Sequence, residues 1–153
     1  MAKTYKIVMD FKKKYPATLT FRLRHHCDVI DKHLNPGEEI LYAFPAQKNE
    51  NFWEIFNTCV VAITNKRIMI GTKRVLWGYF FTSITPDMFN DLTVNNGLLW
   101  GNVIIDTIKE VVTLSNVSSR ALPEVETEIT SYMMEAKKLY PDRSKEKNEV
   151  KEK

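Results

Sequence analysis

The middle of the chain is a series of short segments rich in Val, Ile, Thr and aromatic residues, and this series limits the fold most. About seven such segments lie between residues 38 and 116, at a spacing of about 8–12 residues. Tight-turn signals separate several of them, at Asn65-Lys66, Lys73-Arg74 and Asn95-Asn96-Gly97. Asn tolerates a positive φ, so we expect Asn65 to adopt one in its turn. The pattern predicts an antiparallel β-sandwich or barrel.

Helical patterns flank this series on both sides. Before it, apolar residues recur at steps of three and four and predict a helix over residues 19–34, which Asn35-Pro36-Gly37 ends. The residues that form this stripe are Leu19, Leu23, Cys27, Ile30 and Leu34. After the series, a second helical stripe predicts a closing helix over residues 119–139, with an open end of the barrel as its partner.

The composition is that of one globular domain. The chain has 153 residues, of which 44% are hydrophobic and 27% charged, and this excludes a largely disordered protein. The net charge is +3, but five Lys against Asp10 give the first fifteen residues +4 and leave −1 for the rest. We therefore expect a basic arm over residues 1–18, a domain over residues 19–140 with its barrel at 38–116, and a charged, disordered tail over residues 141–153.

Nothing in the sequence indicates secretion or a membrane span. The N-terminus lacks an apolar signal-peptide core, and the longest apolar run is far shorter than the roughly 20 residues that a membrane helix needs. Cys27 and Cys59 are too few for a disulfide framework. We expect a cytoplasmic protein with free thiols.

Two short motifs resemble the bacterial pleckstrin-homology-like (PH-like) domains. The stretch Leu34-Asn35-Pro36-Gly37-Glu38-Glu39-Ile40-Leu41 is similar to their opening, and residues 61–70, which contain Thr64-Asn65-Lys66-Arg67, are similar to their second hairpin. The resemblance covers roughly residues 35–138. It implies a mainly β (α+β) fold: a seven-stranded antiparallel barrel closed by a C-terminal helix, here with an extra N-terminal helix. It also implies a small, non-enzymatic, intracellular module that often self-associates.

Residues that carry chemistry are sparse. His25-His26-Cys27-Asp28 and His33 form the one cluster of metal-ligand types, and no second group stands at ligand spacing. Packing accounts for Cys27, because it belongs to the apolar stripe of its helix. We expect no catalytic residue, no metal and no cofactor.

The loop at residues 46–56 bears on lipid binding and on protein binding. Its net charge is −1, from Lys48 against Glu50 and Glu54, which argues against the phosphoinositide site that pleckstrin-homology domains often place there. Its aromatic residues include Phe52, Trp53 and Phe56. These either cap the end of the barrel or form a surface for a partner protein.

The segment at residues 75–81 is apolar on both faces if it is a strand. Val75, Trp77, Tyr79 and Phe81 then share one face, with Leu76 and Phe80 on the other. A small barrel buries one face only, so the outer face needs a cover. Either the leading helix covers it or a second copy of the protein does, so we expect Trp77, Tyr79 and Phe81 at an interaction surface.

Basic residues near the N-terminus offer an alternative function. They could contact nucleic acid or an anionic membrane surface through a salt-sensitive charge term. The residues concerned are Lys12, Lys13, Lys14, Arg22 and Arg24. The sequence thus favours a cytoplasmic interaction or oligomerisation module, with anion binding by the basic arm as the alternative.

Overall fold

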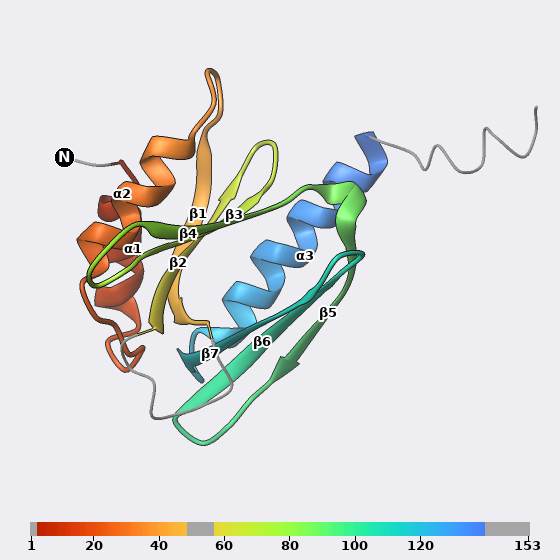
Figure 1. Cartoon of the computed structure of the whole chain (residues 1–153). Helices are drawn as coiled ribbons and strands as arrows, with labels where there is room; N and C mark the ends of the chain where they lie inside the picture. The colour runs from red at the N-terminus through yellow and green to blue at the C-terminus, as the bar shows by residue number, and fades with distance from the viewer. Residues whose placement is uncertain (1–2, 49–56, 140–153) are drawn as a thin grey trace, which may run out of the picture.

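Seven antiparallel strands form one curled sheet in the computed structural model, which describes residues 3–48 and 57–139 (Figure 1). The strands lie in the order β4-β3-β2-β1-β7-β6-β5. In chain order the elements are α1 (Lys3–Lys14), α2 (Leu23–His33), β1 (Ile40–Gln47), β2 (Thr58–Thr64), β3 (Ile68–Lys73), β4 (Tyr79–Ile84), the 3-10 turn η2 (Pro86–Met88), β5 (Phe89–Asn95), β6 (Trp100–Thr107), β7 (Val111–Ser118) and α3 (Leu122–Leu139). This confirms the predicted mainly β, PH-like fold with a C-terminal helix.

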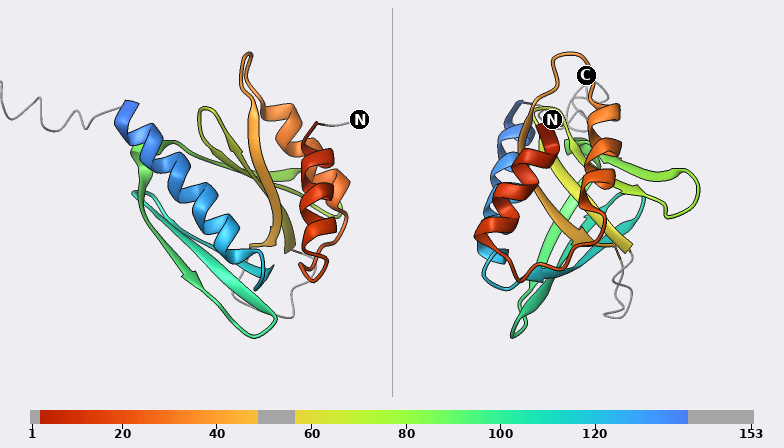
Figure 2. Two further views of the ribbon diagram at one scale, coloured as in Figure 1. Left: turned by 180° about the vertical axis from the view of Figure 1, so that it is seen from behind. Right: turned by 90° about the vertical axis from the view of Figure 1, so that its left-hand side faces the viewer.

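The curled sheet is open on one side, and α3 lies in this opening, between the two halves of the sheet (Figures 1 and 2). Strands β1 and β7 pair at one position, Gln47 with Ser115, so β1–β4 and β5–β7 splay apart. The apolar stripe of α3 fills the space between them with Val125, Ile129 and Met133, all buried in the main core. The closing helix is therefore confirmed, and it begins at Leu122, three residues later than expected.

The first helix, α1, is not in the sequence-based expectation, which places a basic arm at residues 1–18 and one leading helix after it. Residues Lys3–Lys14 form a helix that packs against β1 and α2. Phe11 is buried in the main core against Phe44, at a ring distance of 6.0 Å. Val8 is buried in a second core, between the helices and the outer face of the sheet. The side chain of Asp31 accepts a hydrogen bond from the backbone N–H of Thr4, so α2 caps the start of α1.

The second helix, α2, is shorter than the predicted range of residues 19–34. Arg22 adopts a left-handed backbone with φ of 50°, and the helix begins at the next residue. Cys27 and Ile30 are fully buried against the outer face of β2 and β3. A Cβ at Gly71 would lie 2.9 Å from Cδ1 of Ile30, so this glycine permits the close approach of helix and strand.

Strand β2 is buried along its whole length. Cys59, Val61 and Ile63 face the main core, while Val60 and Ala62 face the helices. Burial on both faces explains why this strand is a continuous apolar run rather than an alternating one.

Two of the three predicted turns are confirmed. Residues 65–67 join β2 to β3, and residues 96–99 join β5 to β6. The prediction for residues 75–81 is partly wrong, because strand β4 begins only at Tyr79. Residues 74–78 form a wider turn, closed by a 3.1 Å hydrogen bond from the N–H of Arg74 to the carbonyl of Gly78. Gly78 has a φ of 72°, which a Val or Trp would adopt only with strain.

Candidate interaction surface

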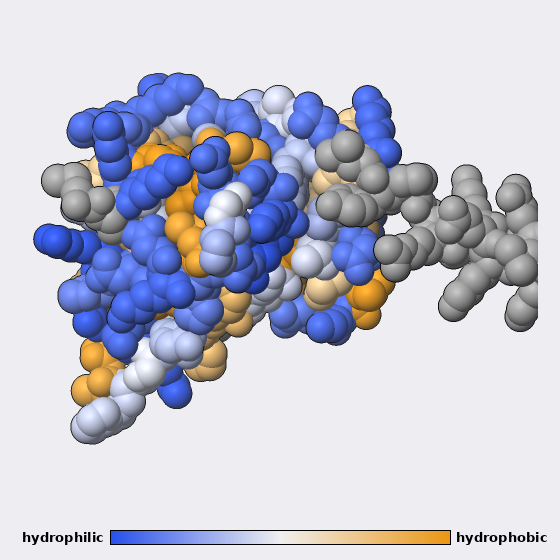
Figure 3. All heavy atoms as spheres, turned by 90° about the horizontal axis from the view of Figure 1, so that it is seen from above, coloured by the Kyte–Doolittle hydropathy of each residue, from blue (hydrophilic) through white to orange (hydrophobic). Residues whose placement is uncertain are grey.

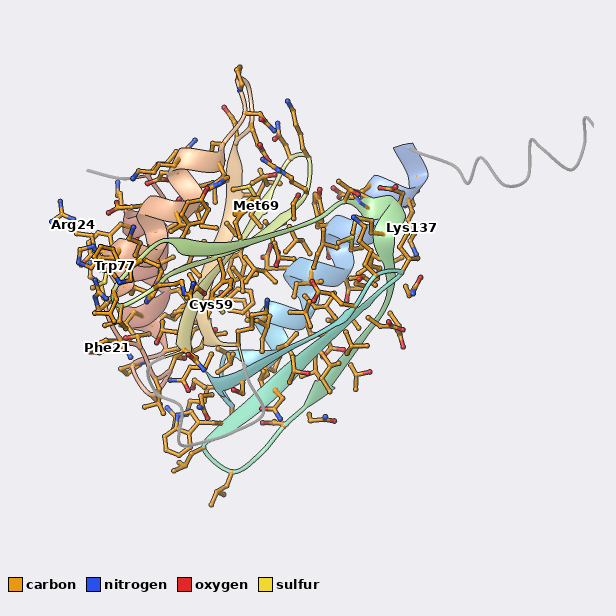
Figure 4. All side chains as sticks on the ribbon, in the orientation of Figure 1. Phe21, Arg24, Cys59, Met69, Trp77 and Lys137 are labelled. Carbon is orange, nitrogen blue, oxygen red and sulfur yellow. The ribbon has the colours of Figure 1, made fainter. Side chains whose placement is uncertain are left out.

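A group of large apolar side chains stays exposed on the hairpin between β3 and β4. We call it the hairpin patch, and it consists of Val75, Leu76, Trp77, Tyr79 and Phe80. Their exposed fractions run from 51% for Tyr79 to 82% for Leu76 and Trp77. The turn stands away from the body of the molecule in the right-hand view of Figure 2, and Figure 4 labels Trp77 on it. Seen from above, this projection carries pale and orange atoms beside a largely blue surface (Figure 3).

The two faces of β4 have different surroundings. Phe81 stacks on the ring of His33 in α2 at 4.0 Å, and the ring of Tyr79 lies 5.0 Å from the same imidazole. Phe80 points to the opposite face, where the guanidinium of Arg74 lies 4.8 Å from its ring. The leading helix thus covers Phe81, as one of the two alternatives expected, but leaves Trp77 and half of Tyr79 exposed.

A buried ion pair fixes the end of α2 to the start of this hairpin. Nε and Nη2 of Arg67 donate to the two carboxylate oxygens of Glu38 at 2.9 and 3.0 Å, and the Glu38 side chain has no solvent exposure. Nη2 of Arg67 also donates to the carbonyl of His33 at 2.7 Å, and Nη1 donates to the hydroxyl of Ser83 in β4 at 3.2 Å. We call Glu38, Arg67 and their partners the clasp.

The clasp carries much of the resemblance noted in the sequence. Thr64 donates its hydroxyl proton to Glu38 at 2.7 Å, and the N–H of Asn35 donates to the same carboxylate at 3.0 Å. Burial alone would raise the pKa of Glu38, but the hydrogen bonds from Arg67, Asn35 and Thr64 outweigh it and lower the pKa to about 2. Glu38 is therefore a carboxylate at neutral pH, and it joins the two family-like motifs.

The role expected for Asn65 is wrong. Asn65 has no positive φ; instead its side chain accepts from the N–H of Glu39 at 3.0 Å and donates to the carbonyl of Gly37 at 3.2 Å. Asn is needed here because one side chain both accepts and donates across two chain segments.

Three of the basic residues predicted as an anion site have partners within the chain. The ammonium of Lys12 donates to the carbonyls of Pro16 and Thr18, and burial lowers its pKa. Lys14 pairs with Glu124 at the start of α3, and Lys13 lies 3.6 Å from Asp10. Arg22 is half-buried before α2, and Arg24 is exposed on that helix (Figure 4).

His26 and Cys27 of α2 are buried and have structural roles. Nδ1 of His26 accepts from the N–H of Lys73 at 2.8 Å and Nε2 donates to the carbonyl of Phe21 at 2.9 Å, so the ring is neutral with its proton on Nε2. Burial lowers the pKa of His26 to about 4 and raises the pKa of both Cys27 and Cys59 to about 12. Within residues 3–48 and 57–139, no three His, Cys, Asp or Glu side chains are placed to hold a metal ion.

Some predicted residues fall outside this description, and some exposed residues were not predicted. Phe52, Trp53 and Phe56 lie outside the described residues, as does the predicted tail at 141–153. Leu98 and Leu99 are 95% and 56% exposed, and neither was predicted as part of an interaction surface. Their position beside Gly97, in the turn between β5 and β6, is the sequence signal that could have predicted their exposure.

The curled seven-stranded sheet and its C-terminal helix are consistent with a PH-like domain. The chain belongs to the bacterial PH domain family, which it matches over residues 34–130. Domains of this class are generally non-catalytic binding modules that mediate protein or lipid interactions. No curated protein and no solved structure matches the chain. Of the helices described, none is long and apolar enough to cross a bilayer.

Proposed function

We propose that this bacterial PH domain is a non-enzymatic, cytoplasmic protein-interaction module that binds through the hairpin patch. The observation that carries the proposal is the exposure of Leu76 and Trp77, each 82%, next to Tyr79 and Phe80 on one hairpin. Large exposed apolar side chains gathered on one hairpin mark an interaction site more often than scattered apolar residues do. Trp and Tyr also contribute more binding energy at interfaces than most residue types.

The buried groups support a binding role rather than catalysis. The thiols of Cys27 and Cys59 are buried and have raised pKa values, so they are poor nucleophiles. Free buried thiols also fit a reducing compartment. The alternative of anion binding by the basic arm has less support, because Lys12 and Lys14 are engaged within the chain.

The experiment is affinity capture from the native cytoplasm with three forms of the protein. The wild type is compared with the double variant Leu76→Ser/Trp77→Ser and with a matched control, Leu98→Ser/Leu99→Ser, which removes exposed apolar surface from another turn. We expect the hairpin variant alone to lose the enriched partner. Equal capture by all three forms would overturn the proposal, and circular dichroism checks that each is folded.

A further inference from the structure

Among the residues that the structure describes, β4 and β5 are the edge strands of the sheet, and they differ in how they are protected against pairing with another chain. Strand β4 has the sequence Tyr79-Phe80-Phe81-Thr82-Ser83-Ile84, without a charge or a proline, and it pairs with β3 at six successive positions without a bulge. Strand β5 carries Asp91 and has an irregular register between Phe89 and Asp91. Charges and bulges are the usual protection of an edge against pairing with another chain. Edge β4 lacks both.

The hairpin patch lies at the turn end of this unprotected edge and is large enough for a weak but specific dimer. From the exposed fractions of its five side chains, and about 150–250 Å² for each aromatic residue, it offers on the order of 600 Å². Two copies would then bury roughly 1,200 Å², the lower limit for specific protein interfaces.

Charge complementarity favours a second copy as the occupant. Lys73 and Arg74 precede β4, and Asp87 follows it in η2. When two copies of β4 run antiparallel, the basic end of each strand lies beside the acidic end of the other. The strand between these ends is neutral, so no like charges meet although the chain carries +3. A two-fold axis perpendicular to the sheet produces this arrangement, and the same patch serves both copies.

We propose that the protein forms a homodimer in which the β4 strands of two copies pair antiparallel, so that one sheet continues into the other. This inference rests on the proposed function and names the partner of the hairpin patch. Phe80 and Tyr79 of each copy lie on opposite faces of the joined sheet, and the exposed Leu76 and Trp77 pack against the end of the partner's β4.

The oligomeric state tests the proposal. In sedimentation of the full chain from about 1 to 100 µM, we expect a monomer–dimer equilibrium, because interfaces at the small end of the size range are typically transient. Phe80→Lys puts a cation into the apolar paired edge of each copy and should raise the dissociation constant at least about tenfold. Leu98→Lys adds the same charge at a distant exposed site and should leave it unchanged. A wild type that stays monomeric at the highest concentration, or a Phe80→Lys variant that dimerises as well as wild type, would overturn the dimer.

Cross-linking tests the strand geometry independently. In a two-fold symmetric dimer, a cysteine can form a disulfide with the same cysteine of the partner only if it lies near the centre of the paired strands. We expect one of the variants Phe81→Cys and Thr82→Cys to form an intermolecular disulfide under mild oxidation. Thr93→Cys, at the centre of the other edge strand, should not form one, and the native thiols do not compete because both are buried. Cross-linking through Thr93→Cys alone would refute pairing by β4.

The two proposals can fail separately. If the wild type is monomeric but still captures a partner that Leu76→Ser/Trp77→Ser loses, the homodimer is wrong and the interaction module stands. If neither dimerisation nor capture depends on the hairpin patch, both are wrong.

Discussion

Replacing Arg67 with Met tests the clasp, because it removes the guanidinium and keeps most of the aliphatic stem. The change leaves the carboxylate of Glu38 buried without a cation, and it leaves the carbonyl of His33 without its 2.7 Å donor. Removing one partner of a buried ion pair typically costs about 3–5 kcal/mol. We expect a loss of that size at pH 7, a large part of the roughly 5–15 kcal/mol that stabilises an ordinary domain.

The loss should depend on pH with a predictable sign. In the wild type the pKa of Glu38 is lowered to about 2, so its stabilisation is complete above about pH 4.5 and is lost as the pH falls towards 2. Without Arg67, only Asn35 and Thr64 oppose the effect of burial, and we expect burial to outweigh them and raise the pKa of Glu38 above its unfolded value. The variant then gains stability from protonation while the wild type loses it. The difference in the free energy of unfolding between the wild type and Arg67→Met should therefore become smaller as the pH falls from 6 to 3.

Urea unfolding followed by circular dichroism measures these differences, with Glu38→Gln and the double variant completing a mutant cycle. We expect strong coupling, because Arg67→Met should cost much less when Glu38 is already neutral. Arg74→Met is a matched control at the far end of the same hairpin and should change stability by no more than about 0.5 kcal/mol. A cost for Arg67→Met below about 1 kcal/mol, or additive effects of the two substitutions, would refute the account of the clasp.

Three further predictions concern the N-terminal helices. Phe11→Ala should lower the free energy of unfolding by about 3–5 kcal/mol, because its ring is buried in the main core. Lys13→Ala, on the exposed side of the same helix, should have little effect. Equal effects of the two substitutions in chemical denaturation would contradict this prediction. Asp31→Ala should cost about 1 kcal/mol and speed amide hydrogen exchange in α1, since it removes the acceptor at the start of that helix; unchanged exchange would show that Asp31 does not cap it. The pKa of His26 is lowered from 6.5 to about 4, so the wild type should lose about 2 kcal/mol between pH 7.5 and pH 5, as the unfolded chain takes up a proton that the folded chain does not. His26→Gln should lose much less over that range, and parallel pH curves for the two proteins would be the contrary result.

Local patterns predicted the strands and the closing helix well. The turn at Asn95-Asn96-Gly97 and the helical stripe through Val125 and Ile129 are signals that a few neighbouring residues carry. The contact between Glu38 and Arg67 joins residues 29 positions apart, and no local pattern states which distant groups will meet. For the same reason Asn65 was placed in the correct turn but given the wrong role, because its partners Gly37 and Glu39 lie in another segment.

Two errors in the prediction have specific physical causes. The lysines of the first fifteen residues obscured the spacing of Val8, Phe11 and Tyr15, which is that of one helix face. The residues at 75–77 have high β propensity, but Gly78 adopts a positive φ and the chain turns there. Among the predicted interaction residues, Trp77 and Tyr79 are exposed, while Phe81 is largely covered by α2.

Because α1 packs into the core, the folded domain extends beyond the region that matches the family. The family match spans residues 34–130, yet Phe11 is buried in the main core against Phe44 of β1, and Glu124 accepts hydrogen bonds from Tyr15 and Tyr42. A fragment cut at the family boundaries would expose the apolar residues that α1 and α2 cover. Removing residues 1–14 therefore removes part of the core together with the basic charges. A loss of binding after that deletion would not show that the basic residues bind an anion.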